Sequence, residues 1–483
     1  MPRNSTELQR SVAAKSTKSD GDGDGGGGGG SCELELGCGC DNANRSDAEN
    51  LGPIGDPSLL APEGPCDGGL QAYLFFGSAF MIEALLWGMP TTFGTFNAFY
   101  RKHPNFRDSP YIPIIGALCT SIPFFGAPIA TYYVTRYRQY QRQMVWGGFA
   151  ICVLSLIFAS FATHVWGLIL FQGAGFGIGV LMLYYAVLEM VNSWFVANRG
   201  TAYGALFGAA GCAGIGLPFG FQFLLDNYDY STTLRIYAFI LICFVGAPMA
   251  FCRGRYTYTT PNTKAWNNFD WKIMMKSTFA MFWVANVFQG VAFVLPTVYL
   301  TRFANILSLT EFQSTMVTSM LLGLSVLSQV AVGKATDKFR LSPIPIAAVS
   351  SLISACLCIL WLFSRSFGAL LTFAILFGFF AGGYSTLWPR LNMSVSACSD
   401  AQAFLYGFLA FGRGLGNIIA IVLSVWFMNN GGAGAQNSVA GFGSMIMLAT
   451  LVLFVSSILS IASVAMNWVK ARRTKTSMSS PSA

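Results

Sequence analysis

Residues 344–363 read IPIAAVSSLISACLCILWLF, twenty residues without a charged side chain. About 20 largely apolar residues are what an α-helix needs to cross the hydrocarbon core of a bilayer. The chain holds twelve such runs, separated by polar or Gly/Pro-containing breaks, with cores at 72–98, 111–134, 144–163, 166–190, 201–224, 233–252, 277–300, 312–333, 344–363, 368–389, 402–428 and 442–468. The sequence therefore predicts an all-α membrane protein with twelve transmembrane helices.

The composition of the chain agrees with this interpretation. Of 483 residues, 54% are hydrophobic and only 10% are charged, whereas an average soluble domain is about 25% charged. The net charge of +8 is too small and too scattered for nucleic-acid binding. The sequence contains no HExxH, GxSxG or P-loop motif, and its two histidines, His103 and His164, fall in expected outer loops. We therefore expect neither an enzyme nor a metal or cofactor site.

Polar segments divide the chain into five regions. Residues 1–66 are rich in Gly and Asp and predict a disordered cytosolic tail. A polar connection at 253–276 separates two sets of six spans, residues 67–252 and 277–469, and residues 470–483 form a second expected tail. Two bundles of six helices are typical of carriers that work by alternating access about a site near the middle of the membrane.

The positive charges predict the orientation of the chain. With a cytosolic N-terminus, the inner connections hold seventeen Lys and Arg residues and the outer ones hold six. Cytosolic loops of membrane proteins carry such an excess. We therefore expect both termini in the cytosol, and the plasma membrane rather than the vacuolar or another internal membrane.

Several short motifs resemble one family. The entry to the first span reads Asp67-Gly-Gly-Leu-Gln-Ala-Tyr73, the approach to the fifth reads Trp194-Phe-Val-Ala-Asn-Arg-Gly-Thr-Ala-Tyr-Gly204, and the eleventh contains Gly412-Arg-Gly-Leu-Gly-Asn417. Together with Gly333-Lys-Ala-Thr-Asp-Lys338, they resemble the monocarboxylate transporter (monocarboxylate porter) family of the major facilitator superfamily, particularly its fungal members. The resemblance covers roughly residues 67 to 470. It implies the major facilitator superfamily fold, with its two bundles of six helices, and transport of an organic acid.

The sequence departs from that family where its characterised carriers bind a carboxylate. The resemblance places a lysine after the proline of the first span, and an acid and an arginine four residues apart in the eighth. Thr91, Ser325 and Gln329 occupy these positions here. The resemblance therefore implies the carrier fold without the usual groups for a lactate-like substrate.

Two charged residues lie deep in expected spans. Inserting a charge at the centre of a helix in a bilayer costs about 2.5–3.5 kcal/mol, so Glu83 in the first span and Arg413 in the eleventh are functional candidates. We expect Glu83 to carry a proton and Arg413 to bind a substrate oxygen. The competing interpretation is structural, with Glu83 buried as a neutral acid and Arg413 bonded to backbone carbonyl groups.

Other polar and aromatic residues in the spans complete the candidate site. Apolar walls with a few placed polar groups suit a small amphipathic ligand, and helix packing is the alternative for each aromatic. The expected pathway adds Gln172, Tyr184, Asn286, Gln289, Tyr384 and Trp388 to Glu83, Arg413, Thr91, Ser325 and Gln329. We expect Glu189, Arg199, Asp337 and Lys338 to form a cytosolic gate through ion pairs that break and re-form.

The function that these features favour is secondary transport of a small organic molecule, with protons as the candidate coupled ion. The absent family charges favour export of a metabolite or another unconventional substrate. Uptake of a monocarboxylate or similar acid is one alternative, and a non-transporting membrane sensor on the carrier fold is another. The expected partners are the substrate, protons and the lipid bilayer, and the sequence leaves the oligomeric state open.

Overall fold

The structure, a computed structural model, describes residues 65–478 except 108, 110, 257–270, 397 and 431–438. The expected tail at 1–66 therefore lies outside the described residues save Pro65 and Cys66, as does most of the connection at 253–276. Within the described part, eleven helical segments are long and apolar enough to cross a membrane, and a bent pair makes a twelfth. This confirms the expected all-α fold with its twelve spans.

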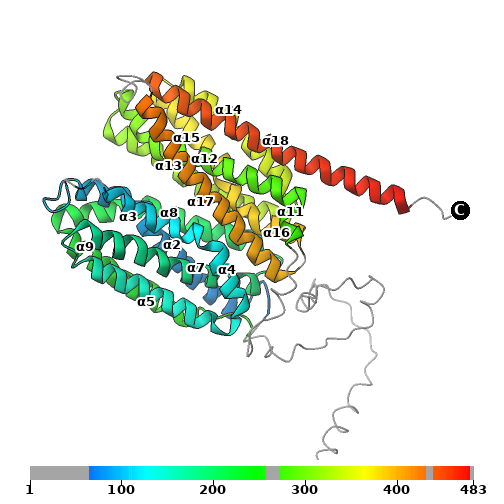
Figure 1. Cartoon of the computed structure of the whole chain (residues 1–483), viewed down its shortest axis with the longest axis horizontal. Helices are drawn as coiled ribbons and strands as arrows, with labels where there is room; N and C mark the ends of the chain where they lie inside the picture. Colours follow the sequence, from blue (N-terminus) through cyan, green and yellow to red (C-terminus); the bar gives the residue numbers. More distant parts are fainter. Residues whose placement is uncertain are drawn as a thin grey trace, which may run out of the picture. The chain divides into compact units, whose positions relative to one another are not determined.

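The first six spans form the N-terminal bundle, drawn in blue to green in Figure 1. The bent pair is its second span, in which α3 and α4 meet at 46° beside Gly126, between Pro123 and Pro128. A π-helical turn interrupts the fourth span and another the sixth. The elements are α2 (Leu70–Tyr100), α3 (Ile112–Phe125), α4 (Ala127–Arg136), η1 (Arg138–Tyr140), α5 (Gln141–Ala159), α6 (Val165–Leu168), η2 (Ile169–Gly175), α7 (Phe176–Trp194), α8 (Arg199–Asn227), α9 (Tyr230–Leu241), η3 (Ile242–Gly246) and η4 (Pro248–Phe251).

The last six spans form the C-terminal bundle, whose aromatic core includes Trp361 stacked on Phe373 with ring centroids 5.2 Å apart. Its tenth span is broken at Gly383, and its last helix continues into the stretch expected as a tail. The elements are α11 (Lys272–Met275), α12 (Ser277–Ile306), α13 (Glu311–Lys338), α14 (Pro343–Phe363), α15 (Phe367–Gly382), η5 (Gly383–Leu387), α16 (Trp388–Val395), α17 (Ser399–Asn430) and α18 (Val439–Met478).

Local signals in the sequence explain where two of these helices begin. Thr310 and Gln313 form a reciprocal capping box at the start of α13, which satisfies two backbone N–H groups that the first turn leaves unpaired. Asp67 accepts hydrogen bonds from the backbone N–H groups of Val196, Ala197 and Asn198 at 2.8–3.1 Å. The entry motif of the first span thus holds the turn that leads into α8.

The outer surfaces of the helices are apolar. Leu154, Phe158, Val422 and Leu451 are each about half exposed or more, and no more than 56% of the residues in the most apolar window of any span are buried inside the protein. Contiguous exposed apolar surface of this kind needs a partner other than water. A bilayer supplies that partner around both bundles.

The two bundles approach each other most closely where α8 crosses α13. A Cβ atom on Gly204 would lie 2.4 Å from the carbonyl oxygen of Gln329, and one on Gly333 would lie 2.3 Å from the carbonyl oxygen of Gly200. No side chain fits at either distance. The small residues that the sequence shows in the fifth span therefore allow direct backbone contact between the bundles.

Candidate functional site

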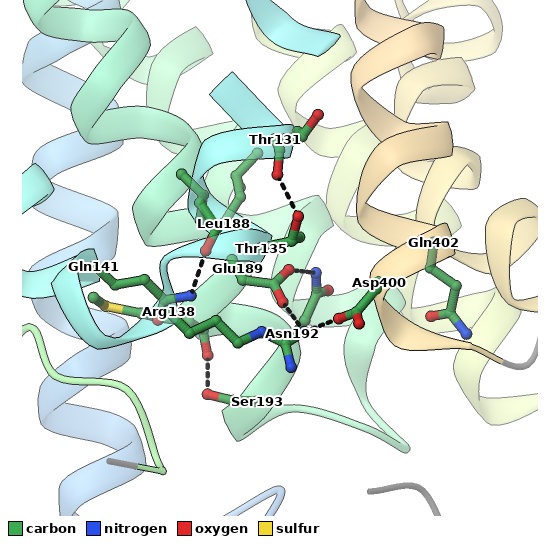
Figure 2. A network of polar contacts seen from close by, with 12 residues as sticks. Thr131, Thr135, Arg138, Gln141, Leu188, Glu189, Asn192, Ser193, Asp400 and Gln402 are labelled. Atoms are coloured by element: carbon green, nitrogen blue, oxygen red, sulfur yellow. Dashed lines mark hydrogen bonds and ion pairs between the residues drawn. The ribbon is translucent and has the colours of Figure 1, made fainter. Parts of the chain in front are cut away.

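A first latch joins the bundles at the end predicted to face the cytosol. Arg138 of η1 donates a hydrogen bond to Glu189 of α7 at 2.9 Å and also pairs with Asp400 of α17. Asn192 donates to the second oxygen of Glu189 at 3.3 Å. Figure 2 shows the guanidinium group between the two carboxylates. One carboxylate belongs to the same bundle as Arg138 and the other to the opposite bundle.

The charged side chains of the first latch are shielded from water. Those of Arg138, Glu189 and Asp400 are at most 14% exposed, so each charge is stabilised by its partners rather than by water. A guanidinium group has five donors in a planar fork and can serve two carboxylates at once. If the bundles part at this end, Arg138 keeps Glu189 and only Asp400 leaves.

A second latch lies at the end of α13. Asp337 accepts hydrogen bonds from the backbone N–H groups of Gly200 at 3.1 Å and Thr201 at 2.6 Å, in the first turn of α8. Arg390 of α16 donates to the same carboxylate at 2.9 Å and to the carbonyl oxygen of Ala197 at 2.9 Å. A carboxylate is favoured at a helix N-terminus because it satisfies free N–H groups there. Here that carboxylate comes from the opposite bundle.

The other two residues expected in the gate lie beside the latches. Arg199 is buried and donates to Gln402 of α17 at 2.8 Å, which gives a third polar contact between the bundles. The ammonium group of Lys338 lies 5.5 Å from the ring centroid of Phe339. The structure thus brings Glu189, Arg199 and Asp337 into contacts at the predicted cytosolic end, whereas Lys338 lies over a ring.

Sequence reasoning missed four residues of this region: Arg138, Arg390, Asp400 and Gln402. The two arginines counted only among the inner positive charges that set the orientation of the chain. Asp400 and Gln402 precede an apolar run and carried no motif. Their position at the start of the eleventh span, opposite an arginine-rich inner loop, is the signal that could have identified them.

An aromatic cluster lies between the bundles next to the first latch. The hydroxyl groups of Tyr184 on α7 and Tyr406 on α17 are 3.4 Å apart, and the ring of Trp388 lies 5.6 Å from that of Tyr406. A cavity of about 10 Å³ separates this cluster from the carboxylate of Glu189. That volume is close to what one water molecule needs.

Glu83 is a buried carboxyl group in the middle of α2. Its residue is 4% exposed, and it lies within electrostatic range of the phenol groups of Tyr184, Tyr185 and Tyr406. Within the described part of the chain, no hydrogen bond or ion pair forms on its carboxyl group. Because an isolated charge is costly at this depth, the group is suited to exist in a neutral, protonated form that can lose its proton when water or a cation arrives.

Arg413 is a guanidinium group without a carboxylate partner among the described residues. It donates a hydrogen bond to the side-chain oxygen of Gln289 on α12, and its guanidinium carbon lies 5.0 Å from the ring centroid of Phe293. It lies fourteen residues into α17, or about 21 Å at 1.5 Å per residue, and therefore near the middle of the span. A guanidinium group with only neutral neighbours can donate hydrogen bonds to a negatively charged oxygen.

Most of the other expected pathway residues hold helices together. Asn286 donates to the carbonyl oxygen of Leu409 at 2.7 Å, and Gln172, within the π-helical turn η2, accepts from Tyr100 at 2.7 Å. Gln289 and Gln329 donate to the carbonyl groups of Ala381 and Gly382, and the ring of Tyr384 stacks on that of Phe282. Thr91 and Ser325 donate to carbonyl groups within their own helices, those of Trp87 and Leu322. Gln289 also accepts a hydrogen bond from Arg413.

Two bundles of six spans, joined by ion pairs at one end and with the ionisable groups of Glu83 and Arg413 deep in their spans, are the architecture of a multi-pass secondary transporter. The family model described as Major Facilitator Superfamily matches residues 70–421. The chain belongs to the major facilitator superfamily.

Three similar proteins come from fungi. The MFS transporter asaE of Aspergillus flavus is 23% identical over 402 residues, which cover 82% of this chain and 89% of that protein. The Fujikurins efflux protein of Gibberella fujikuroi is 29% identical over 39% of this chain and 40% of its own length. The probable transporter MCH2 of Saccharomyces cerevisiae is 24% identical over 65% of this chain and 66% of its own length.

A solved structure supports the fold. The E. coli fucose:proton symporter FucP matches with a TM-score of 0.55 and 15% identity, over 80% of this chain and 98% of that protein. At this identity the similarity shows the shared architecture alone.

Proposed function

We propose that this protein is a proton-linked transporter that exports a small organic molecule by alternating access. The observation that carries the proposal is the pair of latches. Both join the N-terminal and C-terminal bundles at the predicted cytosolic end, and both consist of charged contacts that can part without unfolding either bundle. Closing and opening them would block and admit a substrate on the cytosolic side.

Glu83 is the proposed proton carrier. Its carboxyl group is buried, lacks a bonded partner within the described residues, and lies near the tyrosines at the bundle boundary. A carboxyl group in that position is neutral when protonated and must find a cation or water when it ionises. Alternate exposure to the two sides of the membrane would couple that proton to the movement of the substrate.

Arg413 is the proposed contact for an oxygen of the substrate. Its side chain has a neutral hydrogen-bond partner and an aromatic ring beside it, and it is partly accessible. The positions where the family resemblance implies a lysine, an acid and an arginine hold Thr91, Ser325 and Gln329, which bond to backbone carbonyl groups. The substrate site would therefore rely on Arg413 instead.

The direction of transport rests on the missing carboxylate-binding groups and on the similarity to a protein named for efflux. We place the carrier in the plasma membrane with both termini in the cytosol. A guanidinium group able to bind an anion also favours uptake of an organic acid as a second candidate function.

Comparative metabolite profiling tests the proposal. Cells with and without the protein are grown in the same medium, and small molecules are measured in the medium and in the cytosol. Export predicts a compound that is enriched in the medium and depleted in the cytosol only when the protein is present. The opposite distribution supports uptake, and identical profiles under all tested media contradict a transport function.

A further inference from the structure

The tenth span is broken where α15 passes into the 3-10 segment η5, which leads into α16. At this break, the last three carbonyl groups of α15 and the first of η5 each accept a hydrogen bond from a side chain. Ser350 of α14 donates to Phe380 at 2.5 Å, Gln289 of α12 to Ala381 at 3.1 Å, Gln329 of α13 to Gly382 at 3.5 Å, and Thr386 to Gly383 at 2.5 Å. Three neighbouring helices thus hold the break.

These hydrogen bonds explain why the break is stable inside a membrane. A carbonyl group released from a helix finds no water in the hydrocarbon region, so other side chains must satisfy it. Loss of one donor therefore weakens the break at a defined carbonyl group. An open apolar groove of about 340 Å³ lies beside the break, lined by Phe379, Phe380 and Leu387 and by Val332, Ile346 and Val349.

Gln289 connects the break to Arg413. Its amide nitrogen donates to Ala381, and its amide oxygen accepts from the guanidinium group. An amide oxygen is a neutral acceptor. A carboxylate or another oxyanion makes charge-assisted hydrogen bonds to a guanidinium group that are roughly twice as strong, so an arriving oxyanion would compete with the oxygen of Gln289 for the guanidinium donors.

The helix that follows the break carries contacts at the bundle boundary. Trp388, the first residue of α16, packs against Tyr406. Arg390 belongs to the second latch with Asp337. A looser break would therefore change the position of the helix that supplies one partner of that latch.

We propose that Arg413, Gln289 and the break at Phe380–Gly383 form a relay in which an oxyanion bound to Arg413 loosens the inner half of the tenth span. This inference rests on the proposed function, because it takes Arg413 as the substrate contact. It assigns the substrate class: the transported molecule carries a carboxylate, phenolate, enolate or phosphate oxygen. Substrate binding is then linked to the second latch through one glutamine.

A built-in carboxylate tests the relay without knowledge of the substrate. Phe293 lies one turn after Gln289 on α12 and beside the guanidinium group, so Phe293→Glu places an oxyanion there, and Phe293→Gln is the neutral control of the same size. Hydrogen–deuterium exchange is measured on the full-length protein in detergent micelles. We expect exchange in residues 379–395 to rise about five- to tenfold in Phe293→Glu, which corresponds to the net loss of one hydrogen bond. Equal exchange in the two variants overturns the relay.

A second set of variants keeps the test decisive if Phe293→Glu does not fold. Arg413→Met should raise exchange in residues 379–395 when Gln289 is present and add nothing in the Gln289→Met background, because the relay passes through that residue. Additive effects, or no effect of Arg413→Met, contradict it. Ser350→Ala, which loosens the break without touching Gln289, should leave the response to Arg413→Met unchanged.

The exchange experiment and the metabolite experiment fail independently. If exchange behaves as expected but no compound is transported, the relay stands and the transport function is wrong. If a compound is transported but Phe293→Glu and Arg413→Met leave exchange unchanged, the relay is wrong and the transport function stands.

Discussion

Asp400 of α17 pairs with Arg138 of η1 across the boundary between the bundles, and Arg138 also holds Glu189 of its own bundle. Arg138 therefore has one carboxylate partner in its own bundle and one in the opposite bundle. Because the side chain of Asp400 is 14% exposed, its separation requires water or another cation to take the place of Arg138. We therefore expect the contact between Asp400 and Arg138 to be intact when the predicted cytosolic end is closed and broken when that end is open.

Replacement of Asp400 should favour the state that is open at that end. Asp400→Asn keeps the shape of the side chain and removes its charge, and we expect the closed state to lose about 1–3 kcal/mol. Hydrogen–deuterium exchange in residues 131–142 and 398–406 should rise. The control is Asp226→Asn in the last turn of α8, where the carboxylate accepts from Gln222 of the same helix and bonds to no other helix within the described residues. Equal exchange in both variants would show that Asp400 does not hold the bundles together.

Replacement of Asp337 should destabilise the protein more than replacement of its neighbour. Asp337→Ala leaves two backbone N–H groups of α8 and the guanidinium group of Arg390 without their shared acceptor, with an expected cost of about 2–4 kcal/mol. Lys338→Gln removes a charge one residue away that lies over the ring of Phe339, and it should have little effect. Denaturant titration of both variants in detergent measures the difference, and similar stabilities contradict the assignment of the second latch.

A side chain at Gly204 should separate the bundles. Gly204→Val places a Cβ atom 2.4 Å from the carbonyl oxygen of Gln329, so α8 and α13 must move apart. Transport should fall by more than tenfold while the spans stay folded. Gly216→Ala, on the same helix, introduces a methyl group where no atom lies within 4 Å and should retain transport. Full transport by Gly204→Val would mean that the close approach plays no part in the cycle.

The sequence predicted the spans and their division into two bundles because both depend on local patterns. An apolar run of about 20 residues and a polar break between two sets of six are visible without knowledge of the fold. The deep charges Glu83 and Arg413 were visible for the same reason, since any charge inside an apolar run is conspicuous. These features needed no information on which helices touch.

The partners of the gate residues were not predictable because they lie far apart in the chain. Arg138 and Asp400 are 262 residues apart, and the packing of α4, which leads into η1, against α17 brings them together. The hydrogen bonds of Gln289 and Gln329 were not predictable for a related reason. Both donate to carbonyl groups at the break in the tenth span, where Gly382, Gly383 and Pro389 were the sequence signals that were not used.

Flux measurements on the purified protein test proton coupling through Glu83 most directly. The metabolite identified by profiling is loaded into proteoliposomes that contain the full-length protein, and its flux is measured with and without a pH gradient. The wild-type protein should show flux that the gradient accelerates. Glu83→Gln should lose that acceleration and still exchange labelled for unlabelled metabolite, because glutamine keeps the shape of the site but cannot carry a proton. Equal acceleration by the gradient in the wild type and Glu83→Gln would contradict proton coupling through Glu83.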